Sequence, residues 1–179
     1  DGTVWYNSTG GALKYAIQGA AAWASGTTSP AAKQGGTGFG ASASSAIMAT
    51  GNLYPPSSIT TNCQKYDGTT WTEVNDVNTG RKYLASAGAS PQTAGLIFAG
   101  GLVPGPGTLY VINEEWDGTC WSEEADANTA RNNTQGSGTS TAALLFGGTL
   151  PSLTDITESW NGTAWTEVND LNTARSSAG

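Results

Sequence analysis

Short apolar runs that end in glycine recur along the chain and predict buried strands. They occupy residues 45–50, 94–99 and 142–146, and each stops just before a Gly-Asn or Gly-Gly pair. A short apolar run closed by glycine is typical of a buried strand followed by a tight turn. All of these runs are too short to span a bilayer, so no membrane insertion is expected. The pattern favours an all-β chain.

An Asx-Gly pair lies between two aromatic residues some way after each run and predicts a hairpin. The pairs are Asp67-Gly68, Asp117-Gly118 and Asn161-Gly162. Such pairs favour two-residue type I′ turns, in which both central residues have positive φ. With that loop Trp160 stands opposite Thr163 and Glu158 opposite Trp165, so Trp160 and Trp165 are diagonal neighbours on one face. Each hairpin is thus predicted to carry an aromatic rung: Tyr66 with Trp71, Trp116 with Trp121, and Trp160 with Trp165.

The whole pattern is repeated. The second aromatic of each rung lies ten residues before an arginine, in the pairs Trp71/Arg81, Trp121/Arg131 and Trp165/Arg175, and a degraded copy links Trp23 to Lys33. Trp23, Trp71, Trp121 and Trp165 are separated by 48, 50 and 44 residues. Self-similarity at this period is typical of propellers and other repeat arrays. Residues that recur in every copy are expected to hold the copies together.

The repeat divides the chain into a partial blade, three blades and the start of another. The predicted units are residues 1–32, 33–80, 81–130, 131–174 and 175–179. Four strands per unit predict a β-propeller of about four blades, or a segment of a larger one. Both ends of the chain are predicted to leave unpaired strand edges. These edges could be paired by ring closure within one chain, by further residues, or by a neighbouring subunit, and we expect completion between subunits.

The order of features within a unit resembles the kelch repeat. An apolar strand, Gly100-Gly101, a variable loop, Trp116, Trp121 and Arg131 follow one another as in that family. The resemblance implies a β-propeller. The chain departs from the family in having four residues, rather than six, between the aromatic and the tryptophan.

Two further stretches resemble proteins of phages and bacterial surfaces. DGTVWYNSTGGALKYAIQGAAAW at residues 1–23 is similar to openings of bacteriophage tail and fibre proteins, and NDLNTAR at residues 169–175 to repeats of phage and marine-bacterial surface proteins. These resemblances imply an extracellular or virion-surface location. They imply a structural or adhesive role in a fibre, filament or cell-surface assembly, with other copies of the chain or other surface proteins as partners.

Charge and composition exclude several functions. Seven basic and fourteen acidic residues give a net charge of −7, so binding to nucleic acid or an anionic membrane is not expected. The chain has no histidine, which removes Ser-His-Asp and Cys-His catalysis. Cys63 and Cys120 lie at non-equivalent points of the repeat, and we expect two free thiols.

Acidic residues of the repeat are candidates for catalysis or metal binding. Glu73, Glu123 and Glu167 could be general acids of a glycosidase, but as copies of one position they are expected on separate blades rather than as a facing pair. We therefore expect no enzyme activity.

The Asp-x-Asn pairs of the repeat could supply oxygen ligands to Ca²⁺. They are Asp76/Asn78, Asp126/Asn128 and Asp170/Asn172. Two ligands are too few for Ca²⁺. We instead expect these side chains to fold back on their own turns and Arg81, Arg131 and Arg175 to pair with nearby acids. No cofactor is predicted.

Glycan binding is the alternative function. Exposed aromatic side chains beside polar groups recognise sugars by stacking and hydrogen bonding. Because the rung tryptophans have a packing role, a glycan pocket is expected to use the non-repeating Tyr54, Tyr83 and Tyr110.

Overall fold

The computed structural model describes residues 4–7, 12–15, 27–55, 57–102 and 107–176, with side chains from residue 27 onward. All regular elements in these ranges are β-strands, and their pairing is antiparallel throughout. The prediction of an all-β chain is confirmed. A two-stranded hairpin, β1 (Val4–Asn7) with β2 (Ala12–Tyr15), lies near the N-terminus.

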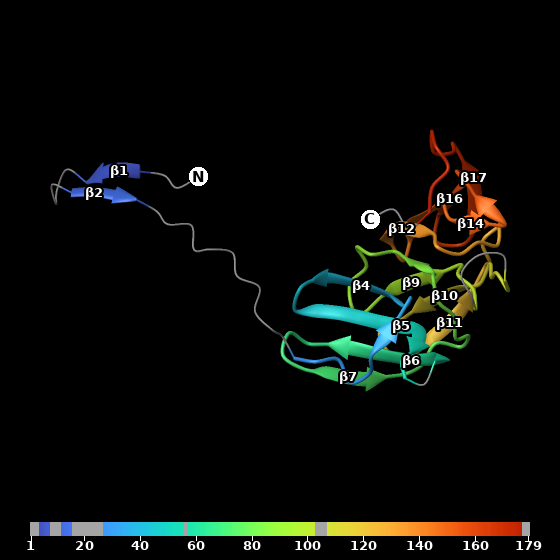
Figure 1. Cartoon of the computed structure of the whole chain (residues 1–179), viewed down its shortest axis with the longest axis horizontal. Coiled ribbons are helices and arrows are strands. Elements are labelled where there is room, and N and C mark those ends of the chain that lie inside the picture. Colours follow the sequence, from blue (N-terminus) through green and yellow to red (C-terminus); the bar gives the residue numbers. More distant parts are fainter. Residues whose placement is uncertain (1–3, 8–11, 16–26, 56, 103–106, 177–179) are drawn as a thin grey trace.

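Three larger antiparallel sheets follow in chain order (Figure 1). The first sheet contains β3 (Lys33–Gln34), β4 (Thr37–Ser42), β5 (Ser45–Leu53), β6 (Ser58–Tyr66) and β7 (Trp71–Val74). The second contains β8 (Ala85–Ser86), β9 (Gly95–Phe98), β10 (Asn113–Trp116) and β11 (Trp121–Glu124). The third contains β12 (Gln135–Thr139), β13 (Ala142–Phe146), β16 (Thr157–Trp160) and β17 (Trp165–Val168). The short pair β14 (Thr149–Leu150) and β15 (Ser152–Leu153) lies between β13 and β16 in the chain.

The predicted apolar strands are inner strands of their sheets. β5, β9 and β13 each lie between a first strand and the aromatic-bearing hairpin, so both of their edges are paired. Leu96, Ile97 and Phe98 of β9 are fully buried, which agrees with an uninterrupted apolar run. The glycines that follow leave the strand with positive φ, as at Gly100 with φ +99°.

The predicted two-residue turns are wrong. Trp160 pairs directly with Trp165, and Glu158 pairs with Glu167, so the loop contains four residues. The other two hairpins have the same register, with Tyr66 opposite Trp71 and Trp116 opposite Trp121.

The side chain of the first loop residue explains the wider loop. Asp67 Oδ1 accepts hydrogen bonds from the backbone N–H groups of Thr69 and Thr70, at 2.8 and 2.7 Å. Asn161 Oδ1 does the same for Thr163 and Ala164, each at 2.9 Å. The glycine is then the loop residue with positive φ, +96° at both Gly68 and Gly162. The Asx side chain therefore closes the loop together with one backbone hydrogen bond, from the N–H of Asp67 to the Thr70 carbonyl at 3.2 Å and from the N–H of Asn161 to the Ala164 carbonyl at 3.3 Å.

The aromatic rungs form in all three sheets. Ring centroids are 4.9 Å apart for Tyr66 and Trp71, 5.3 Å for Trp116 and Trp121, and 5.5 Å for Trp160 and Trp165. Direct opposition brings the rings closer than the diagonal placement predicted from a two-residue turn.

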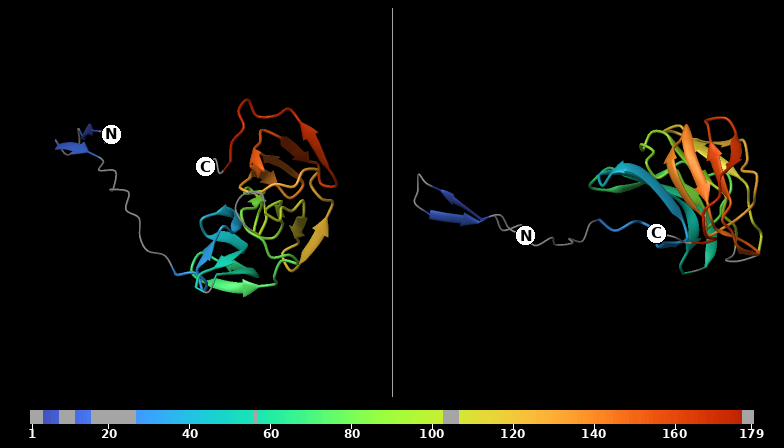
Figure 2. Two further views of the ribbon diagram at one scale, coloured as in Figure 1. Left: turned by 45° about the vertical axis from the view of Figure 1, so that its right-hand side comes forward. Right: turned by 90° about the horizontal axis from the view of Figure 1, so that it is seen from above.

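Neighbouring sheets stack through two hydrophobic clusters. One joins the first sheet to the second and includes Phe39, Ile47, Trp116 and Trp121. The other joins the second sheet to the third and includes Leu96, Phe98, Trp160 and Trp165. Figure 2 shows the three sheets following one another in an arc, with the first and third at its two ends.

A phenylalanine from one sheet meets a rung tryptophan of the next at each contact. Phe39 lies edge-on to Trp121 with centroids 6.1 Å apart, and Phe98 lies edge-on to Trp165 at 4.9 Å. Gly95 and Gly136 make room for these rings: a Cβ at Gly95 would overlap the Phe39 ring, and one at Gly136 would lie 2.7 Å from Phe98 Cζ.

Candidate functional site

The repeated Asp-x-Asn-Thr-x-Arg segments form three links, each of which follows the last strand of a sheet. Link 1 is residues 75–81, link 2 residues 125–131 and link 3 residues 169–175. Each link is fixed to the sheet before it by two equivalent backbone hydrogen bonds. In the first bond, the N–H groups of Val77, Ala127 and Leu171 donate to the carbonyls of Thr61, Val111 and Asp155, at 3.1, 2.9 and 3.0 Å. In the second, the carbonyls of Arg81, Arg131 and Arg175 accept from the N–H groups of Gly51, Gly100 and Gly148, at 3.0, 2.9 and 2.8 Å.

A buried glutamate of the second sheet, Glu114, binds the C-terminal half of link 1. Glu114 Oε2 accepts from the N–H of Asn78 at 2.7 Å, Oε1 accepts from the N–H of Thr79 at 3.4 Å, and Oε1 also pairs with Arg81 Nη1. Both members of the ion pair are 0% exposed. Burial lowers the pKa of Arg81, and the Glu114 charge counteracts that effect.

Link 2 and the third sheet repeat this arrangement. Glu158 accepts from the N–H groups of Asn128 and Thr129 at 2.7 and 3.2 Å and pairs with Arg131 Nη1 at 2.9 Å. The Asn128 amide also donates to the Trp165 carbonyl at 3.2 Å. Burial lowers the pKa of Arg131, and Glu158 again counteracts it. The expected pairing of Arg81 and Arg131 with nearby acids is confirmed.

The repeat pattern as analysed by its tryptophans and arginines does not predict the buried glutamates. Glu114 and Glu158 lie two residues before the first aromatic of their rungs, and Gln64 holds that position in the first sheet. Their alternation with Trp116 and Trp160 places them on the rung face. This recurring offset was the available signal.

The Asp and Asn side chains of links 1 and 3 bond differently from those of the predicted turns. Asp76 Oδ2 accepts from the Thr61 hydroxyl at 2.9 Å, and Asp170 Oδ1 accepts from the N–H of Thr157 at 3.1 Å. Asn78 donates to the carbonyl of Trp121 in the next sheet at 3.3 Å. The expectation that these side chains fold back on their own turns is wrong, because the link runs between two sheets that both offer partners.

In the first sheet, residues 29–33 take the place that links 1 and 2 have on the second and third sheets. Ser29 Oγ donates to Gln64 Oε1 at 2.7 Å, and Lys33 Nζ donates to the carbonyl of Asn62 at 2.6 Å. Burial lowers the pKa of Lys33. A neutral Gln–Ser contact with a nearby lysine thus replaces the Glu–Arg pair. Trp23, the repeat tryptophan of the degraded copy that ends at Lys33, lies outside the described residues.

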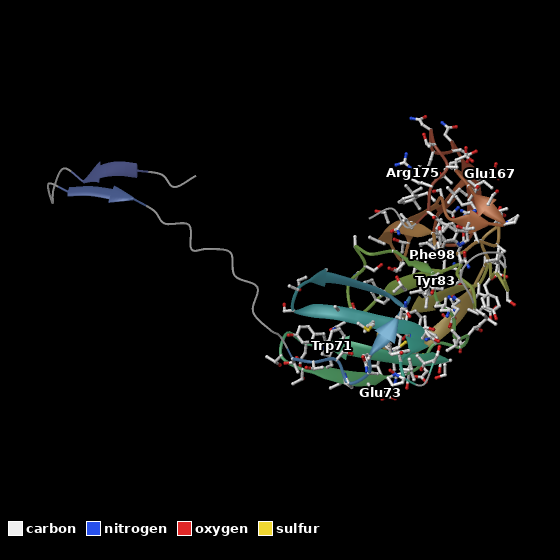
Figure 3. All side chains as sticks on the ribbon, viewed as in Figure 1. Trp71, Glu73, Tyr83, Phe98, Glu167 and Arg175 are labelled. Carbon is white, nitrogen blue, oxygen red and sulfur yellow. The ribbon has the colours of Figure 1, made fainter. Side chains whose placement is uncertain are left out.

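The repeated acidic residues do not gather into one site. Glu73, Glu123 and Glu167 are exposed and each lies on the last strand of a different sheet. In Figure 3, Glu73 lies near one end of the sheet stack and Glu167 near the other. The described residues contain no group of three His, Cys, Asp or Glu side chains arranged to hold a metal ion.

The two cysteines are free thiols, as predicted. Cys63 is buried on β6, and burial raises its pKa to about 11. Cys120 is exposed in the second hairpin loop, where a hydrogen bond from its thiol to Asp117 raises its pKa.

The three tyrosines predicted to bind a ligand have different surroundings. Tyr54 is 69% exposed beyond β5, whereas Tyr83 and Tyr110 are half-buried. Tyr83 has φ +57°, and Lys82 Nζ lies 5.3 Å from its ring centroid. None of the three lines a pocket of about 550 Å³ on the first sheet.

That pocket lies beside a rung tryptophan. Trp71, Phe39, Met48 and Lys33 contribute to its walls, together with a run of glycines. Trp71 is half-buried, whereas its equivalents Trp121 and Trp165 are 7% and 6% exposed. The repeat pattern predicts only a packing role for Trp71 and gives no indication of this pocket.

Comparisons with known proteins found no match to a family model and none to a curated protein. None of the described segments is a helix that could span a membrane.

Proposed function

We propose that this protein is a kelch-like β-propeller, with about four blades or as a segment of a larger ring. Three successive antiparallel sheets, one of five strands and two of four, are joined by equivalent links and arranged in an arc, and they support this assignment. Propellers are built from such blades around a central axis.

Its proposed role is structural or adhesive, in a virion fibre, an extracellular filament or a cell-surface assembly, without catalysis or a cofactor. One observation carries this proposal: the repeated tryptophans and arginines of the second and third units are buried within or between sheets. Trp116 and Trp160 are 1% and 2% exposed, and both Arg–Glu pairs are fully buried. The partners are other copies of the chain or other surface proteins, with no nucleic acid and no membrane insertion.

Electron microscopy with a gold-labelled antibody against residues 27–176 tests this role. Labelling should appear on the outer surface of the virions or cells that carry the protein. Labelling confined to the cytoplasm would contradict the proposed location and role.

Carbohydrate binding is the second candidate, and the pocket beside Trp71 favours it. A half-buried tryptophan in a cavity of about 550 Å³ offers a stacking face to a sugar ring. A glycan array separates the two proposals. Binding that Trp71→Ala abolishes and Tyr54→Ala retains supports the lectin function, whereas no binding to any glycan supports the structural one.

A further inference from the structure

The third sheet exposes apolar positions that the other sheets bury. Leu144 pairs with Ser159, which precedes the rung residue Trp160, and it is 41% exposed. By the same register, Leu96 is its equivalent in the second sheet and Ile47 in the first. Leu96 and Ile47 are 0% and 2% exposed, because each is covered by the sheet that follows it.

Other residues on this face repeat the contrast. Phe146 is half-buried, whereas its equivalent Phe98 is fully buried against Trp165 of the next sheet. Val168 is 41% exposed, whereas its equivalent Val74 packs on the cluster between the first and second sheets.

Link 3 supplies a polar edge to the same face. Its backbone is fixed like that of links 1 and 2, so its N–H groups and arginine are presented in the same way. Arg175 is exposed, and its Nε donates only to the nearby Thr173 carbonyl, at 3.2 Å. Among the described residues, none accepts a hydrogen bond from the N–H groups of Asn172 and Thr173.

We infer that this face, formed by Leu144, Phe146, Val168 and link 3, is the docking site for a further sheet of the same repeat that carries a buried glutamate. The inference rests on the proposed structural function. The glutamate of the partner sheet accepts from Asn172 and Thr173 and pairs with Arg175, as Glu158 does with Asn128, Thr129 and Arg131. A rung tryptophan of the partner packs edge-on against Phe146, as Trp165 packs on Phe98.

The first sheet of a second copy does not fit this description. Its equivalent of Glu158 is Gln64, which offers no charge to Arg175. Ser29 already donates to Gln64, and Lys33 donates to Asn62 next to it, so residues 29–33 occupy the place that link 3 would need. The occupant is therefore a glutamate-bearing sheet of the same repeat, and not the first sheet of a second copy.

A fusion protein tests the inference directly. The chain to Arg175 is continued with a second copy of residues 132–175, which carries its own equivalent of Glu158. Amide hydrogen exchange is then measured by NMR at Asn172 and Thr173. We expect exchange at both amides to slow by about a hundredfold relative to the unfused chain, and the Trp fluorescence to report a folded added sheet.

A matched control carries Glu→Gln only at the added copy of Glu158. It should lose most of the protection at Asn172 and Thr173 while the added sheet remains folded. If the added sheet does not fold, residues 82–131, which contain Glu114, replace it. Unchanged exchange at Asn172 and Thr173 in both fusions overturns the inference.

The unfused chain provides the second arm. Exchange at Asn172 and Thr173 should not depend on protein concentration. Slower exchange at high concentration means that a second copy covers the face, and it overturns the assignment of the partner. Gold labelling of intact virions or cells is independent of both arms, so failure of the docking site is distinguishable from failure of the structural function.

Discussion

Single residues of the repeat act mainly across the boundary between two sheets. Arg131 enters the third sheet from link 2, and Glu158 ties it to the backbone of Asn128 and Thr129. A buried carboxylate is tolerated only with several donors around it, and removal of one member leaves an unpaired buried charge. The Arg–Glu pairs therefore fix how one sheet sits on the next.

Glu158→Gln should destabilise the protein by about 3–5 kcal/mol, because Arg131 loses its buried counter-charge. Glu167→Gln is the control, since Glu167 lies opposite Glu158 in the register but is exposed. Urea denaturation measures both. Equal effects of the two substitutions would show that the buried pair contributes nothing specific.

Trp121→Ala should cost about 3–5 kcal/mol, as expected for truncation of a large buried aromatic. Trp121 is 7% exposed, contacts Phe39 and Trp116, and donates from Nε1 to the Asn75 carbonyl at 3.1 Å. Thermal unfolding tests this, with the half-buried Trp71→Ala as a milder comparison. An unchanged melting temperature together with lost glycan binding would contradict the packing role.

Sequence patterns located the rungs but not the glutamates for a physical reason. Paired tryptophans are rare, so their spacing is informative. Glu114 is followed directly by Glu115, and the two glutamates differ only in burial, which the sequence does not show. The exposed Glu73, Glu123 and Glu167 are the glutamates that the repeat pattern indicates, because they recur in all three units.

Elements of the fold follow from local sequence more closely than the loops that join them. The apolar runs predict β5, β9 and β13, because a short apolar segment closed by glycine is too short for a helix and fits a buried strand. The Asx-Gly pairs predict a hairpin correctly but give the wrong loop length. The pair alone does not reveal that the Asx side chain accepts hydrogen bonds from the backbone N–H groups of the third and fourth loop residues, which accompanies the wider loop here.

The hairpin loops should contribute to acid sensitivity. Hydrogen bonds from backbone N–H groups hold the pKa of Asp67 and Asp117 below the ordinary range. A carboxyl with a lowered folded-state pKa stabilises the fold above its unfolded pKa of about 3.9, and this contribution is lost as the pH falls below that value.

The double substitution Asp67→Asn and Asp117→Asn tests this contribution. Asn161 shows that an amide oxygen accepts the same two hydrogen bonds without titrating. The double variant should therefore lose less stability than the wild type when the pH falls from about 5 to about 2.5, as measured by urea denaturation across that range. Parallel acid profiles for the two proteins would refute the role of these carboxylates.

Removal of divalent ions should have little effect on the links. Asp76 and Asp170 already accept hydrogen bonds from Thr61 and Thr157. EDTA should shift the melting temperature by no more than about a degree or two, since a tightly occupied ion site contributes several kcal/mol. A large drop in melting temperature, restored by Ca²⁺, would identify the Asp-x-Asn pairs as ligands.

The whole molecule is a series of sheets whose contacts follow one pattern. Phe39 of β4 meets Trp121, and Phe98 of β9 meets Trp165, so each contact joins a phenylalanine of one sheet to a rung tryptophan of the next. Leu144 and Phe146 are placed for a third contact of this kind. The repeat period predicts this succession of units. It does not predict which faces are covered, because exposure depends on what stacks against each sheet rather than on the sequence of that sheet alone.

Residue-resolved amide exchange of the unmodified protein tests most directly the claim that the glutamate of the following sheet closes each link. The N–H groups of Asn78 and Asn128 should exchange slowly, since Glu114 and Glu158 accept their hydrogen bonds at 2.7 Å. The N–H of Asn172, in the equivalent position of link 3, should exchange at a rate close to that of an exposed amide. Exchange at Asn172 as slow as that at Asn128, or fast exchange at all three, would contradict the account.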